Sequence, residues 1–155
     1  MKQLKARLIY SNSSTAVNDV RHVSGFVAPD PVLLFLLPKK QILLVSTMEQ
    51  GRADRECYPS VDVLTPEALL LPPEKRWDII EQIQAVATRA GIKMIEVGFD
   101  FPTGIYAKLI ETGCKVQISQ KPNCPMRRTK NIQELECLRR SQRAAVSGMK
   151  QAVSM

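Results

Sequence analysis

The chain has 155 residues, of which 45% are hydrophobic and 24% are charged, and this is the size and composition of one soluble globular domain. The composition excludes a disordered chain, and no run approaches the roughly 20 apolar residues that a membrane-spanning helix needs. The net charge is +7, but residues 1–120 carry 14 basic and 13 acidic side chains, whereas residues 121–155 carry 8 basic and 2 acidic ones. The excess of positive charge therefore belongs to the C-terminal segment.

The first third of the chain alternates short apolar runs with an amphipathic segment. We expect a strand at residues 6–10, followed by a short helix that begins at a capping serine and ends at Gly25. The apolar runs 32–37 and 42–45 predict the two strands of a hairpin, and their continuous hydrophobicity indicates burial on both faces. A sheet buried on both faces requires helices on both sides.

The same alternation continues through the rest of the chain. The expected elements are, in order, a helix at 48–56, a strand at 61–64, a helix from Pro73 to Gly91, a strand at 92–97, a helix at 102–112 and a strand at 115–118. Trp77, Ile80 and Ile83 share one stripe of the long helix, so we expect them to face the core. This order predicts an α/β fold, with a mixed β-sheet and helices on both faces.

A last helix carries the clearest local signals. Asn131 is suited to cap it, and Glu134, three residues later, completes the pattern of a capping box. Apolar residues recur at three- or four-residue spacing beyond this point, with four basic residues between them. The pattern reaches the end of the sequence without a stop signal, so we expect the helix to lead into a further part of a longer protein.

No group of residues in the sequence predicts an active site. His22 is the only histidine, and no cysteine or acidic residue lies at metal-ligand spacing from it. Glu96 and Asp100 are the nearest approach to a carboxylate pair, but we expect Asp100 to cap the following helix and Glu96 to face solvent. The glycines form no phosphate-binding motif, and the cysteines form no CxxC pair. We therefore predict no catalytic residue, metal or cofactor in this chain.

The basic C-terminal segment raises the possibility of nucleic-acid binding, which the residue types do not favour. Single-strand binding surfaces combine basic residues with stacking aromatics, and residues 121–155 contain no aromatic residue. We interpret this charge as one side of a helix that faces solvent or a protein partner. With no export signal and no paired cysteine spacing, the sequence favours a cytoplasmic protein that binds neither nucleic acid nor membranes.

Four stretches, taken in order, carry a resemblance to a known family. The first is residues 21–26 (RHVSGF), and the second is residues 42–53, in which an apolar run is followed by Met48-Glu49 and Arg52-Ala53. The third is residues 96–98 (EVG) with Leu109 and Gly113, and the fourth is residues 127–139 (RRTKNIQELECLR). Together they resemble the N-terminal domain of the Xaa-Pro aminopeptidase, prolidase and creatinase family of pita-bread metallopeptidases. The resemblance implies a ribonuclease-H-like fold for this chain. The long helix that usually precedes the first strand of the family has no counterpart here, which puts any dimer contact of that helix in doubt.

The resemblance also implies a division of the chain. Residues 1–125 correspond to the N-terminal domain, and residues 126–155 correspond to a connector helix leading to a catalytic domain that the sequence does not contain. The connector motif is carried by four residues, which are Arg128, Lys130, Glu134 and Arg139. In the family, two Asp, one His and two Glu of the catalytic domain bind two divalent metals, Mn, Zn or Co, so no catalytic residue is carried over to this chain.

By resemblance, the parent enzyme hydrolyses the bond before proline in peptides with proline at the second position. The N-terminal domain then contributes to subunit association in a homodimer and to the rim of an active site. For that rim we select the loop from His22 to Pro31, with His22, Phe26 and Asp30, although Phe26 fits a core position equally well. Two alternatives stay open, namely the N-terminal domain of a creatinase-like amidinohydrolase and a free-standing binding or scaffold domain without catalysis.

Overall fold

The computed structural model describes residues 4–154, which form two compact units. The sheet unit ends at Cys124, and the helical unit begins at Pro125. None of the helices in residues 4–154 combines the length and hydrophobicity needed to cross a lipid bilayer.

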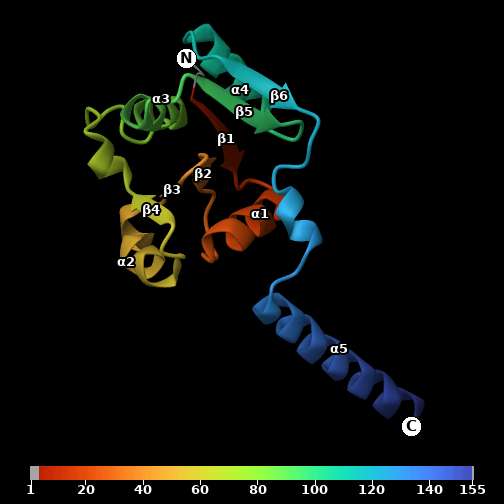
Figure 1. Ribbon diagram of the computed structural model, residues 1–155. Helices are drawn as coiled ribbons and strands as arrows, with labels where there is room; N and C mark the ends of the chain where they lie inside the picture. Colours follow the sequence, from red (N-terminus) through yellow and green to blue (C-terminus); the bar gives the residue numbers. More distant parts are fainter. Residues whose placement is uncertain (1–3, 155) are drawn as a thin grey trace. The chain divides into compact units, whose positions relative to one another are not determined.

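The sheet unit is built on one mixed six-stranded sheet (Figure 1). Its strands are β1 (Lys5–Tyr10), β2 (Leu33–Leu36), β3 (Gln41–Leu44), β4 (Val61–Leu64), β5 (Met94–Gly98) and β6 (Val116–Ser119). They lie in the order β4-β3-β2-β1-β5-β6, and β2 alone runs antiparallel to its two neighbours. This arrangement confirms both the predicted order of elements and the predicted hairpin between β2 and β3.

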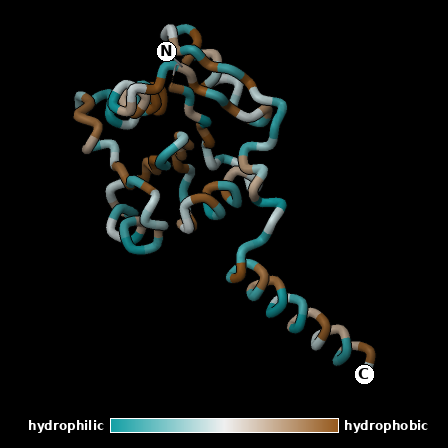
Figure 2. The backbone as a smooth tube through the Cα atoms, in the orientation of Figure 1, coloured by the Kyte–Doolittle hydropathy of each residue, from teal (hydrophilic) through white to brown (hydrophobic). Residues whose placement is uncertain are grey.

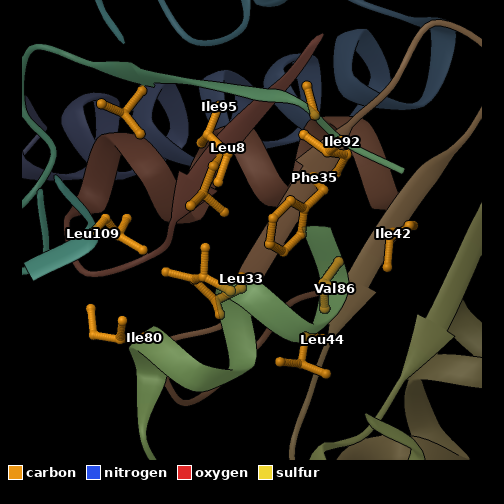
Figure 3. Packing of buried hydrophobic residues seen from close by; sticks show 13 residues of the cluster. Leu8, Leu33, Phe35, Ile42, Leu44, Ile80, Val86, Ile92, Ile95 and Leu109 are labelled. Atoms are coloured by element: carbon orange, nitrogen blue, oxygen red, sulfur yellow. The ribbon is translucent and has the colours of Figure 1, made fainter. Parts of the chain in front are cut away.

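Helices cover both faces of the sheet, as the continuous apolar runs predicted. Side chains of β1 to β3 pack on one face against α3 (Ile79–Ala90) and α4 (Thr103–Glu111), and Figure 3 shows Leu33 and Phe35 among Ile80, Val86 and Leu109. The alternate residues of the same strands pack on the other face against α1 (Ser14–Ser24) and α2 (Thr47–Glu56). The structure therefore has the predicted α/β fold with two hydrophobic cores, one on each side of the sheet.

The ends of α1 follow the predicted capping chemistry. The side chain of Ser13 accepts a hydrogen bond from the Ala16 backbone amide at 3.2 Å, so Ser13 is the N-cap. Gly25 ends the helix with a φ of +80°, in the left-handed region that glycine adopts without strain.

The start of the long helix α3 differs from the prediction. It begins at Ile79, because the carboxylate of Asp78 accepts hydrogen bonds from the backbone amides of Ile80 and Glu81. The preceding segment from the short 3₁₀ helix at Pro66–Leu69 to Asp78 forms turns instead. Trp77 is consequently 67% exposed and does not join the core stripe. A local N-cap thus overrides the apolar periodicity that extended the predicted helix to Pro73.

The helical unit contains a 3₁₀ turn at Pro125–Arg128 and α5 (Ile132–Val153). The predicted capping box is present, because Asn131 Oδ1 accepts from the Glu134 amide at 2.8 Å and Glu134 Oε2 accepts from the Asn131 amide at 2.9 Å. No described side chain of α5 is buried, and apolar and polar residues alternate along it (Figure 2). Its exposed apolar residues are Ile132, Leu135, Leu138, Val146, Met149 and Val153.

Candidate functional site

The rim loop is the predicted segment from His22 to Pro31, which begins in the last turn of α1 and leads toward β2. It turns away from α1 at Gly25, where an added Cβ would lie 3.0 Å from the Glu56 carbonyl oxygen and 3.2 Å from the Tyr58 ring. The Tyr58 amide donates a hydrogen bond to the Ser24 carbonyl at 2.9 Å, which holds the two segments together. Only glycine satisfies both the positive φ and this close approach.

Phe26 is fully buried, so of the two roles expected for it the core position is correct and the exposed one is wrong. Its amide donates to the Ser24 hydroxyl at 3.1 Å, which turns the chain inward, and its ring joins the core beside α1 and α2. The guanidinium of Arg52 lies 4.6 Å from the centre of the ring and donates a hydrogen bond to the Val27 carbonyl. Phe26 therefore anchors the rim loop.

The other two predicted rim residues lie at the surface or near it. His22 is half-buried in the last turn of α1, and Asp30 is exposed in the rim loop. Val27, between them in sequence, is 46% exposed. The exposed part of the loop thus offers one carboxylate and a small apolar surface.

Arg52 of α2 holds the rim loop and is itself held by two carboxylates. It forms ion pairs with Glu49 at 2.9 Å and Glu56 at 3.4 Å, one helical turn away on either side.

At the end of the same helix, burial and the nearby charges of Asp54 and Glu56 raise the pKa of the Cys57 thiol to about 11. A raised pKa keeps this thiol protonated near neutral pH, which makes it a poor nucleophile.

A second polar group, here called the exit cluster, consists of Lys5, Arg7, Glu96 and Ser119. Arg7 of β1 is the register partner of Glu96 in the neighbouring β5, and both side chains lie on the sheet face shared with α1 and α2. Glu96 forms ion pairs with Arg7 and Lys5, and its side chain is 15% exposed. The expectation that Glu96 faces solvent is therefore wrong, because strand pairing places two cations beside it.

The ion pairs of the exit cluster determine the protonation of Glu96. Partial burial by itself raises the pKa of this carboxyl, but hydrogen bonds from Lys5 and Arg7 and the charges of both cations outweigh it. The net effect lowers the pKa from 4.5 to about 2. Glu96 is thus ionised near neutral pH, and its lowered pKa makes it a weak proton acceptor there.

Asp100 does not cap α4, in contrast to the prediction. The N-cap of α4 is Pro102, which has no side-chain acceptor, and Asp100 instead accepts a hydrogen bond from Asn123 Nδ2 at 3.4 Å. The Asn123 side chain lies against Gly98, where an added Cβ would be 2.5 Å from Asn123 Oδ1. Asp100 and Gly98 therefore belong to the surface on which the segment after β6 rests.

The described residues do not fit the metal centre that the family resemblance implies for the parent enzyme. Within residues 4–154, no three His, Cys, Asp or Glu side chains lie close enough together to hold a metal ion. Glu96 belongs to the residue pair that came nearest to a carboxylate pair in the sequence, and it is already paired with two cations.

The four residues of the predicted connector lie in the helical unit. Arg128 ends the 3₁₀ turn, Lys130 lies between this turn and α5, and Arg139 lies in α5, all three exposed. Glu134 is half-buried and forms the capping box with Asn131. Glu134 thus has a structural role in starting α5, and the partner-facing role of the set stays a prediction.

Two groups of notable residues escaped the sequence analysis. One is the exit cluster, whose signal was the presence of charged residues in two otherwise apolar strands, Lys5 and Arg7 in β1 and Glu96 in β5. The other is the pair Leu70 and Trp77, which are 91% and 67% exposed between β4 and α3. Leu70 adopts a φ of +57°, uncommon for a residue other than glycine, and ends the 3₁₀ helix.

Three solved structures resemble this chain in fold. The Xaa-Pro dipeptidase from Bacillus anthracis matches 97% of the chain with a TM-score of 0.77 and 12% identity. The prolidase from Pyrococcus horikoshii matches 98% with a TM-score of 0.69 and 18% identity, and the X-Pro aminopeptidase from Thermotoga maritima matches 96% with 0.70 and 17%. No family model matches the sequence, and no curated protein is similar to it in sequence.

The matches cover nearly all of this chain but only part of each solved structure. The chain spans 39% of the dipeptidase and of the prolidase, and 41% of the aminopeptidase. The chain thus has the fold of the N-terminal domain of Xaa-Pro dipeptidases and aminopeptidases.

Proposed function

We propose that this chain is the non-catalytic N-terminal domain of a cytoplasmic Xaa-Pro peptidase-like metalloenzyme. The observation that carries the proposal is the fold match over 96–98% of the chain to three such enzymes, each more than twice as long. The absence of disulfides among its four cysteines, all within the described residues, agrees with a reducing compartment.

In this proposal, the chemistry belongs to a downstream catalytic domain. That domain would bind two divalent metals, Mn, Zn or Co, which activate water to attack the peptide bond before a proline at the second position. The residues of this chain would supply neither metal ligands nor a nucleophile. Their work would be to shape the rim of an active site and to associate subunits.

We propose that residues 126–155 connect to this catalytic domain. The large exposed apolar residues of α5 form two groups on one side of the helix, one near its start and one near its end, and these groups need a partner surface. Arg139, Arg140, Arg143 and Lys150 lie in the same helix, whose acidic residues are Glu134 and Glu136 alone. The expected partner therefore presents an apolar surface bordered by carboxylates.

We propose that the rim loop borders an active site through its exposed part, with Asp30 and His22 as the contacting residues. The loop is suited to this role because its backbone is fixed by the close approach at Gly25, by the buried Phe26 ring and by the hydrogen bond from Arg52. A loop held in this way can contact a substrate without first paying to become ordered.

Subunit association is the role that we propose for Leu70 and Trp77. Their segment is tied to α3, since Arg89 donates to the Ala68 carbonyl at 2.8 Å and Gln82 donates to the Arg76 carbonyl at 2.8 Å. Large apolar side chains that are exposed on a segment bonded to a helix are suited to anchor an interface. We therefore expect them to bury against a second copy of the chain.

Replacing Leu70 and Trp77 together by serine is expected to weaken self-association at least about tenfold, as measured by analytical ultracentrifugation. Met48→Ser is the matched control, because Met48 is also exposed (94%) but lies on α2. A wild-type chain that sediments as a monomer at every concentration, or equal dissociation constants for the three proteins, would contradict this role.

The isolated chain is expected to show no turnover of Xaa-Pro dipeptides in the presence of Mn²⁺, Zn²⁺ or Co²⁺. The reason is that residues 4–154 bring together no set of metal ligands. Release of free proline by the purified chain, above a heat-denatured control, would show that it contains catalytic groups and would overturn the division of labour proposed here.

The coding sequence beyond codon 155 tests the proposal as a whole. A reading frame that continues for one further domain with two Asp, one His and two Glu as metal ligands supports it, and an immediate stop codon refutes it. A stop codon would favour a free-standing binding or scaffold domain. Turnover of creatine in place of Xaa-Pro peptides by the full protein would favour the creatinase-like alternative.

A further inference from the structure

We infer that Arg7 is a positioning residue that clasps the segment leaving the sheet and so fixes the point from which the rest of the chain departs. The exit segment is defined as residues 120–124, between the end of β6 and the end of the sheet unit. That the part positioned is a catalytic domain rests on the function proposed above; the clasp itself is a property of the sheet unit alone.

The exit segment crosses back over the sheet after β6. β6 is the edge strand, β5 lies next to it, and β1 with Arg7 is the third strand from that edge. Arg7 Nη1 nevertheless donates hydrogen bonds to the carbonyl oxygens of Pro122 and Asn123, the second at 3.2 Å. The segment therefore runs from the edge over β5 to β1, on the face that carries Glu96 and Gly98.

Arginine suits this position because its planar guanidinium offers several donors in fixed directions. While Nη1 binds the two exit carbonyls, Nη2 donates to Glu96 on β5 and to the Ser119 hydroxyl at the end of β6, the latter at 3.0 Å. One side chain thus ties three neighbouring strands to the segment that crosses them. The Arg7 side chain is only 16% exposed, so water competes little for these bonds.

Three further contacts confine the exit segment to the same path. The Lys121 amide donates to the Ser119 hydroxyl at 3.2 Å, and Cys124 at the end of the segment is buried. The Asn123 side chain occupies the space above Gly98 that any Cβ would fill. The sheet unit consequently continues five residues past its last strand, and its boundary falls after Cys124.

Loss of the clasp would move the point of departure back to the end of β6. Five more residues would then become linker, and an extended chain of that length reaches about 17 Å. The inference therefore predicts that removing Arg7 frees the exit segment while the strands of the sheet stay in place.

The test compares Arg7→Met with Lys5→Met in the full chain. Both variants remove one cation from Glu96, but only Arg7 contacts the exit segment, so Lys5→Met is the matched control. We expect Arg7→Met to raise amide exchange at Lys121, whose amide donates to the Ser119 hydroxyl, at least about tenfold while exchange in β1 and β5 stays protected. Lys5→Met should leave all of these rates near those of the wild type.

Thiol alkylation provides a second measurement on the same proteins. Cys124 is buried and Cys137 is exposed on α5, so peptide mass spectrometry can use Cys137 as an internal reference. Alkylation of Cys124 relative to Cys137 should rise at least about tenfold in Arg7→Met and stay unchanged in Lys5→Met.

Unchanged exchange and alkylation in Arg7→Met, or equal increases in both variants, would overturn the inference. If Arg7→Met unfolds as a whole, Arg7→Lys decides the question, since it keeps a cation beside Glu96 but lacks the fork that spans both carbonyls. Its exit segment should be released while the strands stay protected. None of these measurements involves a catalytic domain, so their failure would leave the proposed function standing, and a stop codon after residue 155 would leave the clasp standing.

Discussion

Replacing Phe26 by alanine is expected to lower the free energy of unfolding of the sheet unit by about 3–5 kcal/mol. The ring is fully buried against α1, α2 and the strands, so its loss removes hydrophobic contacts and leaves a cavity. It also removes the surface over which the Arg52 guanidinium lies. Because a domain of this size is stabilised by only about 5–15 kcal/mol in total, urea unfolding followed by circular dichroism should show a large decrease in midpoint.

Asp30→Ala is the matched control for Phe26→Ala. Asp30 belongs to the same rim loop but is exposed, so this substitution should change the free energy of unfolding by no more than about 0.5 kcal/mol. A loss below about 1 kcal/mol for Phe26→Ala would contradict the buried position of the ring. Phe26 would then be a candidate for direct contact with a substrate, together with His22 and Asp30.

The order of elements and most of their ends were predictable because their signals are local. Apolar runs identified the strands, and Gly25, Asn131 and Glu134 marked helix ends through hydrogen bonds within three or four residues. The same reasoning placed helices on both faces of the sheet, since continuous apolar strands have no other means of burial. Fold class therefore followed from residues that act on their immediate neighbours.

The errors arose where a tertiary contact or a competing local signal decided the outcome. Trp77 fits an apolar helical stripe, but the Asp78 carboxylate binds the amides that follow it and starts the helix two residues later than Trp77. Phe26 lies in a loop between Gly25 and Val27, and only the packing of α1 and α2 against the sheet shows that it is buried. In both cases, the sequence did not show which of two competing interactions would be the stronger, and the structure does.

The exit cluster was not predictable for a related reason. Arg7 and Glu96 are 89 residues apart, and their contact depends on the register between β1 and β5. A sequence shows that each strand carries a charge among apolar residues, but it does not show which strands are neighbours. The exit segment adds two backbone carbonyls to the cluster, which no pattern of side chains reveals.

Glu96→Gln is expected to lower the free energy of unfolding by about 3 kcal/mol near neutral pH. The pKa of Glu96 is lowered to about 2 in the folded chain from an ordinary value of 4.5, and this difference measures how strongly folding favours the carboxylate. The stabilisation is fully present above the unfolded pKa and is lost as the pH falls from about 4.5 toward 2. Glutamine keeps the shape of the side chain but lacks its charge for Arg7 and Lys5.

The difference in stability between the wild type and Glu96→Gln should therefore shrink steadily as the pH is lowered through this range, because the wild-type carboxyl becomes protonated. Urea unfolding of both proteins at a series of pH values measures it directly. Asp62→Asn is the control, since the Asp62 side chain is 53% exposed in its ion pair with Lys40 and should contribute no more than about 1 kcal/mol. A pH-independent difference for Glu96→Gln would mean that Glu96 acts through packing, and that the two cations of the exit cluster are held in place without its charge.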